Sequence, residues 1–403
     1  MIIQNETLLK IEILIRGVEF TQNALKKAKN DNAKIQNLVY NMPENSSICR
    51  PQELFIKGND GYSTVVSCIT SHCEKSAVII DVNYKNELFA NIENKNINDI
   101  IIEFVKEPSY YSRTISNGEI LKKYISACGY DELNILPWKG CAISKVCKFC
   151  GVNTFCDKND NEVFNAHTLS KNIQIWESKK EEYFNNLNEA IEIAIEDECY
   201  QEHMHLIIIS GNLSEDCLDI QSQIYAEIAE NIKSKVTNKL SEGIVVVMTP
   251  PKDVNMLIKM KDSGIQIVVF NLEVGNEPWF SKYCPGKSEL GIDFFENKLK
   301  QAVNIFGKGN VWTNFVLGLE PVDKLIEVCR ELAKFGIVPG ANVLHFDKGN
   351  QLDCSRPKKE DVIYFFTELS KIYRENNIKP YYCSKALRTS LSNEAFDGRI
   401  INE

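Results

Sequence analysis

The sequence predicts an α/β protein whose larger part is a partial (β/α)6 barrel of the TIM type, preceded by a small N-terminal α/β domain. From about residue 132 onward, six short runs alternate with amphipathic helical patterns. Most of these runs are rich in Ile and Val and nearly continuous, which is typical of strands buried on both faces. Strand–helix units in series form a parallel sheet by right-handed crossovers. A barrel and a doubly wound sheet both fit this series, but no G-x-G-x-x-G motif opens a helix after a strand, which weakens a Rossmann interpretation.

The pattern divides the chain into three parts. We expect an N-terminal α/β domain over residues 1–131, the barrel over 132–378 and a closing segment over 379–403. The first domain is predicted to open with an amphipathic helix over Leu8–Lys29. Short strand-like runs follow this helix, at Ser63–Ile69, Ala77–Val82 and Ile100–Val105.

The barrel elements follow in chain order. The predicted strands are Leu133–Leu136, Leu206–Ser210, Ile244–Thr249, Ile265–Glu273, Val311–Leu317 and Ile337–His345. The predicted helices are Lys179–Glu198, Cys217–Ser234, Pro251–Asp262, Glu289–Phe306, Pro321–Phe335 and Lys358–Asn376. In a barrel, catalytic groups gather on the loops that follow the carboxyl ends of the strands.

Composition narrows the function classes. The chain has 403 residues, of which 44% are hydrophobic, and a net charge of −9. No hydrophobic run of membrane length and no signal peptide are visible, so a cytoplasmic location without a membrane partner is expected. No basic run stands out, which disfavours a nucleic-acid partner. Fourteen cysteines without an export signal argue against a disulfide framework and favour metal or cluster ligation or buried thiols.

Three cysteines dominate the chemistry of the sequence. Cys141, Cys147 and Cys150 form a C-x5-C-x2-C array in the loop after the first barrel strand. Three close thiolates suit a [4Fe–4S] cluster that keeps one iron open. With Cys156 the same residues could instead form a closed zinc site in a non-catalytic binding or scaffold protein. A closed four-cysteine cluster for electron transfer is a further alternative.

Polar and small residues end three later strands. Ser210 and Gly211 form a turn where a ligand approaches the backbone closely, unless it is an ordinary βα turn. Asn271 and Glu273 alternate with apolar residues and therefore share one face, where they suit ribose hydroxyls. Gly318 ends the fifth strand, either as a platform for an adenine ring or as a turn glycine. Lys287 either pairs with a ligand carboxylate or is solvated.

These parts, in this order over about residues 132–350, resemble the radical S-adenosylmethionine (SAM) superfamily and its biotin-synthase-related enzymes. Phe149 beside Cys150 is typical of that family, where an aromatic residue shields cluster and adenine. The usual loop is C-x3-C-x2-C, so two residues are extra here. The longer loop is similar to that of the radical enzyme implicated in building the iron-guanylylpyridinol cofactor of an archaeal hydrogenase. The family's Gly-Gly-Glu turn is here Ser210-Gly211-Asn212, so we expect backbone carbonyls to meet the SAM amino group.

The resemblance implies a [4Fe–4S] cluster held by Cys141, Cys147 and Cys150, and SAM bound by Ser210, Gly211, Asn271, Glu273, Lys287 and Gly318. Reductive cleavage of SAM to a 5′-deoxyadenosyl radical is then expected, with electrons from a reductant such as flavodoxin or ferredoxin. The radical abstracts hydrogen from a small-molecule substrate in a biosynthetic or cofactor-assembly step. Nothing selects among methylation, carbon–carbon bond formation, sulfur insertion and rearrangement.

Substrate contacts are sought near the strand tops and in the tail. His345 ends the sixth strand, and Cys383 and Arg388 lie in the closing segment, where Arg388 suits a substrate carboxylate or phosphate. Each has a plain structural alternative, such as a hydrogen-bonded histidine or a surface arginine. An auxiliary cluster is a further possibility, on Cys156, Cys217, Cys284 and Cys383.

Overall fold

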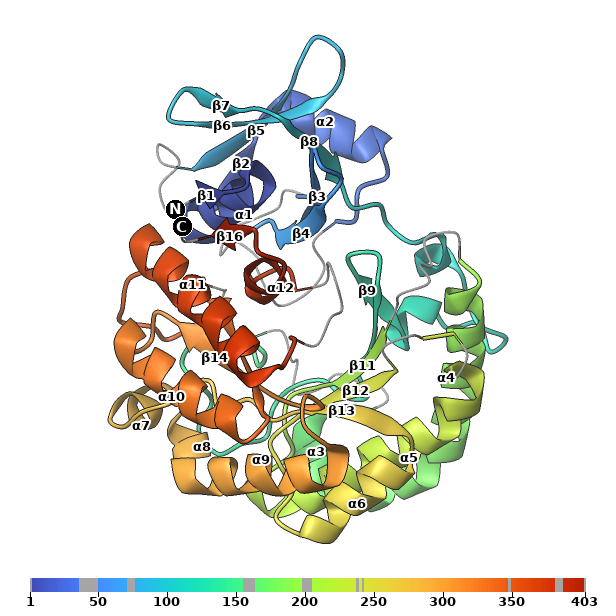
Figure 1. Cartoon of the computed structure of the whole chain (residues 1–403). Coiled ribbons are helices and arrows are strands. Elements are labelled where there is room, and N and C mark those ends of the chain that lie inside the picture. Colours follow the sequence, from blue (N-terminus) through green and yellow to red (C-terminus); the bar gives the residue numbers. More distant parts are fainter. Residues whose placement is uncertain are drawn as a thin grey trace.

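A curled, seven-stranded sheet is the largest of the four sheets in the described part of the chain (Figure 1). The computed structural model describes residues 2–35, 50–70, 77–154, 164–197, 205–236, 239–240, 243–346, 349–380 and 387–401. In this sheet the edge strand β9 pairs antiparallel with β10, and every other pair of neighbouring strands is parallel. Its strands, in spatial order, are β15 (Val338–Val343), β14 (Val311–Leu317), β13 (Ile265–Val269), β12 (Ile244–Val247), β11 (His205–Ile209), β10 (Glu132–Ile135) and β9 (Ser126–Cys128). The prediction of an α/β fold on a curled half-barrel sheet is confirmed, whereas the sixfold (β/α) count stays a prediction.

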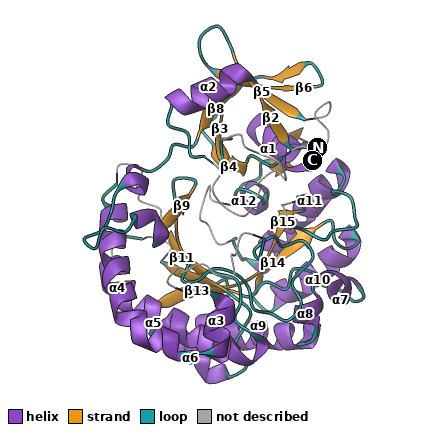
Figure 2. Cartoon of the chain, turned by 180° about the vertical axis from the view of Figure 1, so that it is seen from behind, coloured by secondary structure: helices purple, strands orange, loops and turns teal. Residues whose placement is uncertain are grey.

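Helices cover the outer face of this sheet (Figures 1 and 2). They are amphipathic: α10 buries Leu325, Ile326 and Cys329, which recur at helical spacing against the sheet. The helices are α3 (Ala166–Lys171), α4 (Gln174–Ile195), α5 (Leu218–Val236), α6 (Val254–Asp262), α7 (Trp279–Tyr283), α8 (Pro285–Ser288), α9 (Ile292–Phe306), α10 (Val322–Lys334) and α11 (Lys359–Asn376). Among the described helices, none is long and apolar enough to cross a membrane.

Two smaller sheets lie at the open side of the half-barrel (Figures 1 and 2). The first has the order β2 (Val18–Phe20), β5 (Val78–Val82), β6 (Leu88–Ile92) and β7 (Lys95–Ile97). The second has the order β4 (Ser63–Ser67), β3 (Glu53–Gly58) and β8 (Ile100–Phe104). Two 3₁₀ turns, at Ser109–Ser112 and Leu121–Lys123, lead to β9. The boundary at residue 131 stays a prediction, and β9 already pairs with β10 before it.

The single helix predicted over Leu8–Lys29 is wrong. The structure has α1 (Asn5–Arg16), the strand β2 and then α2 (Gln22–Asn30). Gly17 ends α1 with a φ of 78°, in the left-handed region that glycine tolerates, and its N–H donates to the carbonyl of Ile13. Val18 therefore leaves the helical face and pairs with Val78 of β5.

The tail of the chain returns to the N-terminal part. β16 (Ile400–Ile401) pairs antiparallel with β1 (Ile2–Ile3), and α12 (Ser392–Phe396) packs on α11. The buried Lys10 ammonium lies 2.7 Å from the Glu394 carboxylate. Both charges are removed from water, so this ion pair holds its two segments in one specific arrangement.

Arg388 is not available as a clamp for a substrate. Its guanidinium lies 2.5 Å from the Glu53 carboxylate, which also pairs with Lys34 at 2.6 Å and accepts from the Gly129 N–H. Burial alone would raise the pKa of Glu53, but the Lys34 and Arg388 charges lower it. The expected substrate contact gives way to a structural ion pair, because burying the Glu53 carboxylate requires compensating cations.

Candidate active site

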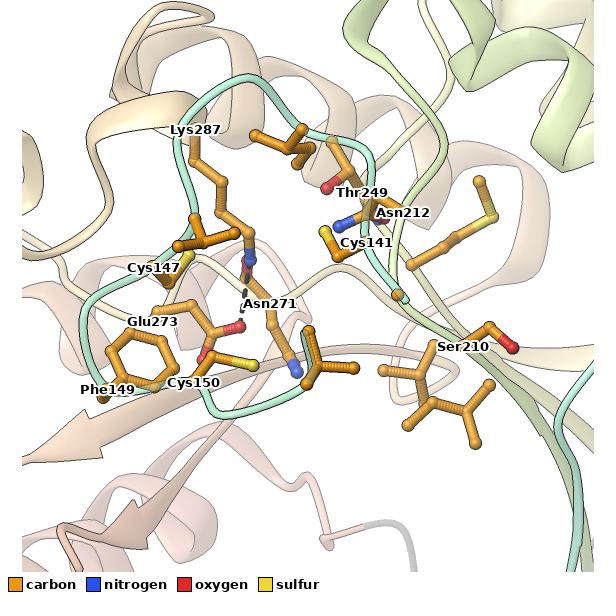
Figure 3. Close-up of a pocket in the computed structure, with 17 residues that line it drawn as sticks. Cys141, Cys147, Phe149, Cys150, Ser210, Asn212, Thr249, Asn271, Glu273 and Lys287 are labelled. Carbon is orange, nitrogen blue, oxygen red and sulfur yellow. Dashed lines mark hydrogen bonds and ion pairs between the residues drawn. The ribbon is translucent and has the colours of Figure 1, made fainter. Parts of the chain in front are cut away.

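The cluster loop and the ends of β11, β12 and β13 enclose a cavity of about 150 Å³. Figure 3 shows Phe149, Cys147 and Cys150 on one side of it and Cys141 across from them. Most of the site residues predicted from the sequence line this cavity: Cys141, Cys147, Phe149, Cys150, Ser210, Gly211, Asn271, Glu273 and Lys287. Positions separated by up to 146 residues therefore form one site at the carboxyl edge of the sheet, where barrel enzymes place their chemistry.

The cysteine loop is held in shape by hydrogen bonds of its own. The Asn153 side chain bonds Cys141 twice, accepting from its N–H at 2.8 Å and donating to its carbonyl at 3.0 Å. The N–H of Ala142 donates to the Asn212 carbonyl at 2.7 Å, which ties the loop to the turn after β11. The loop is therefore preorganised by polar contacts of the chain itself. Asn153 was missed from the sequence, because an asparagine beyond the last cysteine carries no motif.

Gly211 permits the close approach of the cysteine loop. A Cβ atom at this position would lie 2.2 Å from the Gly140 carbonyl oxygen and 2.7 Å from Cys141 Cβ. Only a residue without a side chain fits between these backbone segments. The Ser-Gly turn was predicted to admit a ligand, and in the structure it admits the loop that carries Cys141.

We expect Gly211→Ala to displace Cys141 and to lower the amount of iron that the reconstituted protein retains, with the overall fold kept. Iron and sulfide per chain, together with circular dichroism, measure this. The control is Gly61→Ala: Gly61 has a φ of 89°, so alanine strains that turn, but the added methyl group meets nothing within 4 Å and the turn lies outside the cavity lining. Its iron content should equal that of the wild type. Equal iron in both variants would contradict the role of Gly211.

The Ser210 side chain does not point into the cavity. Its hydroxyl donates to the Trp138 carbonyl at 2.8 Å and lies away from the cavity in Figure 3. The Trp138 indole N–H donates to the Gly211 carbonyl at 2.6 Å. The expected contact of the Ser210 and Gly211 carbonyls with the SAM amino group stays a prediction. Because the Gly211 carbonyl oxygen already accepts from Trp138, only its second lone pair remains for such a contact.

Asn271 and Glu273 lie beyond the strand that was predicted to carry them. β13 ends at Val269, so the prediction of a strand to Glu273 is too long. The segment after it nevertheless docks on β14: the Asn271 amide oxygen accepts from the Asn314 N–H at 3.0 Å, and the Val316 N–H donates to the Glu273 carbonyl at 2.8 Å. Glu273 has a φ of 71°, rare for a residue other than glycine, which costs about 1–3 kcal/mol. Such strain is concentrated at functional sites.

Lys287 is buried and ion-paired, which rules out the solvated alternative. Its ammonium lies 2.9 Å from a Glu273 carboxylate oxygen and donates to the Asn271 carbonyl at 2.8 Å (Figure 3). Burial by itself would lower the pKa of Lys287, but the Glu273 carboxylate and the Cys147 sulfur outweigh it and raise this pKa. The lysine therefore stays charged and fixes the two residues predicted to meet the ribose.

Glu320 forms hydrogen bonds with the turn that follows Glu273. Its carboxylate accepts from the Gly275 N–H at 2.6 Å and from the Asn276 side chain at 2.7 Å. Burial raises the pKa of Glu320. Glu320 lies two residues after Gly318, but its partners lie in the turn after Glu273, about 45 residues earlier in the chain, so no local sequence pattern reveals the contact.

The thiols of the site differ in their electrostatic surroundings. Burial raises the pKa of Cys141, and it raises the pKa of Cys150 to about 12. A hydrogen bond from the Cys284 thiol lowers the pKa of Cys147, against the effect of burial. A metal or cluster ligand has to be a thiolate, so two of the three thiols need the charge of the bound group to release their protons.

The remaining predicted residues lie elsewhere. Gly318 follows β14 with a φ of 117°, and a Cβ there would lie 3.1 Å from the Pro357 ring, so it packs against the chain outside the described cavity lining. His345 is half-buried, with its Nδ1 atom 3.1 Å from the Val343 carbonyl, and does not line that cavity either. Cys383 falls outside the described residues.

Four cysteines were considered for an auxiliary cluster. Cys217 contacts the Ser170 carbonyl at 3.6 Å, whereas Cys284 contacts Cys147. Cys156, which would complete a zinc site, and Cys383 lie outside the described residues. Within the part of the chain that the structure describes, no group of three or more His, Cys, Asp or Glu side chains is arranged around a single ion. A cubane cluster binds its cysteines on different irons, so the three thiols around one cavity fit a cluster.

Comparison with known proteins adds three similarities. The chain is 28% identical over 238 residues to a bacteriochlorophyllide c C-7(1)-hydroxylase of Chlorobaculum limnaeum, covering 57% of this chain and 56% of that protein. The chain thus spans about half the length of this curated relative. Among solved structures, a radical SAM methyltransferase from Sphaerobacter thermophilus matches at a TM-score of 0.38 and 13% identity, over 74% of this chain and 73% of that one.

The methyltransferase among these solved structures is named as a radical SAM enzyme, which agrees with the resemblance predicted from the sequence. The [FeFe]-hydrogenase maturase HydG from Carboxydothermus hydrogenoformans also matches, at a TM-score of 0.38 and 15% identity over 65% of this chain and 57% of that one. No protein-family model matches the chain. Radical SAM enzymes use a [4Fe–4S] cluster and S-adenosylmethionine, and the three cysteines and polar strand ends around the cavity fit both.

Proposed function

We propose that this protein is a radical SAM enzyme in which Cys141, Cys147 and Cys150 hold a [4Fe–4S] cluster. The observation that carries the proposal is the convergence of these cysteines with Asn271 and Glu273 on one cavity at the carboxyl edge of the sheet. Bound there, cluster and SAM supply reductive cleavage of the sulfonium to methionine and a 5′-deoxyadenosyl radical.

The chain's own residues bind and orient SAM in this proposal. Asn271 and Glu273 contact the ribose hydroxyls, and Phe149 shields the cluster from one side of the cavity. The Lys287 ammonium uses two of its donors on Glu273 and Asn271, so its third N–H remains for the SAM carboxylate. Gly318 lies beyond the described cavity lining, and its contact with adenine requires the ligand to extend along β14.

The substrate is proposed to lie inside the half-barrel, where hydrogen abstraction is protected from water. The N-terminal sheets and the tail lie at its open side, and the pairing of β1 with β16 and the buried Lys10–Glu394 ion pair join them. The curated relative is named as a hydroxylase of bacteriochlorophyllide c, which supports a reaction at a C–H bond of a small organic molecule. A cytoplasmic reductant such as flavodoxin or ferredoxin completes the proposal.

The direct test is SAM cleavage. The anaerobically reconstituted protein, reduced with dithionite, is expected to form 5′-deoxyadenosine and methionine from SAM in equal amounts, measured by liquid chromatography with mass spectrometry. Unreduced protein is the control and should form neither. A reduced, iron-loaded protein that leaves SAM intact would contradict the proposal, as would a colourless protein that retains stoichiometric zinc.

A further inference from the structure

The inner face of the half-barrel sheet is only partly covered. In β10, β11 and β12 the side chains that face the outer helices are fully buried, as for Ile135, Ile208 and Val246. Ile209 and Val247 alternate with such residues and point to the inner face, where both are half-buried and line the cavity of the candidate active site. This part of the sheet therefore presents apolar side chains to solvent inside the half-barrel, beside the proposed SAM site.

Leu136 extends this inner face toward the edge of the sheet. β10 ends at Ile135, but Leu136 precedes Pro137, and a residue before proline favours an extended backbone. The alternation of β10 therefore continues, and Leu136 points to the opposite side from Ile135. Because Ile135 pairs with Ile208, Leu136 lies beside Ile209. Leu136 is 44% exposed, although its neighbour Ile135 is fully buried.

Leu136 begins an apolar row that crosses five neighbouring strands on the inner face. Paired residues of parallel strands place their side chains on the same face of a sheet. The register gives the members of this row, which we call the inner row: Leu136, Ile209, Val247, Val269 and Trp312. Exposure falls along the row from 44% at Leu136 to 2% at Trp312. The row is therefore closed at β14 and open at β10.

The composition of the inner row determines what it can bind. None of its five side chains carries a charge, and its one polar group, the Trp312 indole N–H, already donates to the Asn314 side chain at 2.7 Å. A polar group placed on this surface would lose water without gaining a partner, whereas hydrocarbon or aromatic surface gains by leaving water. Ile209 and Val247 belong both to the row and to the cavity lining, so a ligand on the row lies next to the proposed SAM site.

We propose that the inner row binds an apolar part of the substrate, a hydrocarbon chain or an aromatic ring, and that Leu136 is a specificity-determining residue at its open end. This inference rests on the proposed function, because the row is continuous with the cavity proposed to hold SAM. It places the apolar part of the substrate nearest to SAM. It excludes a substrate that is polar over its whole surface, such as a sugar phosphate.

A leucine that is exposed without any ligand is the competing explanation, because folded proteins carry many exposed apolar side chains. In that case a polar residue at this position changes no binding. Ile258 on α6 provides the comparison, since it is 47% exposed, about as much as Leu136, but lies on a helix outside the sheet. The same substitution at both positions separates apolar exposure in general from binding at the inner row.

The experiment is a fluorescence titration of the reconstituted full chain with N-phenyl-1-naphthylamine, an uncharged aromatic probe that brightens when it leaves water. We expect saturable binding to the wild type and a dissociation constant about tenfold higher for Leu136→Ser, because the apolar contact of one leucine is lost. Leu136→Met keeps an apolar side chain of similar size and should bind the probe as the wild type does. Ile258→Ser is the matched control, and its dissociation constant should also equal that of the wild type.

Equal probe affinity in Leu136→Ser and the wild type would overturn the inference. A wild type that does not bind the probe, or an equal loss of affinity in Leu136→Ser and Ile258→Ser, would overturn it too. These results leave the proposed function intact as long as the wild type cleaves SAM. If Leu136→Ser retains less iron than the wild type, Leu136→Gln is titrated instead, with the same results deciding. A reduced, cluster-loaded wild type that leaves SAM intact would overturn the proposed function, and this inference with it.

Discussion

Replacing Cys150 with alanine is expected to remove the cluster and all cleavage of SAM while the barrel stays folded. Two remaining thiolates do not hold a [4Fe–4S] cluster that already keeps one iron open. The fold survives because the loop is held by Asn153 and Asn212 rather than by the cluster. Iron per chain should fall from about four to near zero, 5′-deoxyadenosine should disappear, and the circular dichroism spectrum should match that of the wild type.

Cys217→Ala is the control for this experiment. Cys217 is half-buried, contacts the Ser170 carbonyl and does not line the cavity. The iron content and SAM cleavage of the Cys217→Ala protein should equal those of the wild type if the chain carries one cluster. Retained colour and turnover in Cys150→Ala would contradict the assignment, and a loss of iron in Cys217→Ala would indicate an additional cluster.

The second large effect is expected at Glu273. Glu273→Ala leaves the buried Lys287 ammonium without its carboxylate, and removing one partner of a buried ion pair costs about 3–5 kcal/mol. The same change removes the side chain proposed to bind the ribose, so SAM affinity should also fall. Chemical denaturation measures the first effect, and equilibrium binding of SAM to the reconstituted protein measures the second.

A double variant separates these two consequences. Glu273→Ala with Lys287→Met removes the unpaired charge and should recover much of the lost stability without recovering SAM affinity. The matched control is Glu327→Ala, which breaks an exposed ion pair with Lys324 and should cost at most about 1 kcal/mol. Unchanged SAM affinity in Glu273→Ala would rule out the ribose contact, and unchanged stability would contradict the burial of the pair.

Strands buried on both faces were the best-predicted part of the fold. Val311–Leu317 is found as predicted, and Ile244–Thr249 and Ile337–His345 differ by a few residues at their ends, because continuous β-branched runs leave few alternatives. The N-terminal helix was mispredicted because Gly17 interrupts an apolar pattern that continues in phase through Val18. A glycine inside a helical pattern is tolerated in some contexts, and here the pairing of β2 with β5 decides against the helix.

The residues that line the cavity could be predicted from their positions at strand ends. The contacts that hold these residues in place could not. Asn271, Glu273 and the cysteines could be assigned because parallel strands bring their carboxyl ends together. Asn153 and Glu320 act through partners whose proximity only the folded chain creates. Arg388 was misread for the same reason, since its partner Glu53 lies 335 residues earlier in the chain.

Binding of SAM to the cluster is measured by the EPR spectrum of the anaerobically reconstituted and reduced protein, recorded with and without SAM. We expect a reduced [4Fe–4S] signal whose g-values shift when SAM is added, because in the proposed site SAM binds the iron that the three cysteines leave open. A reduced-cluster signal that is identical with and without saturating SAM would contradict it.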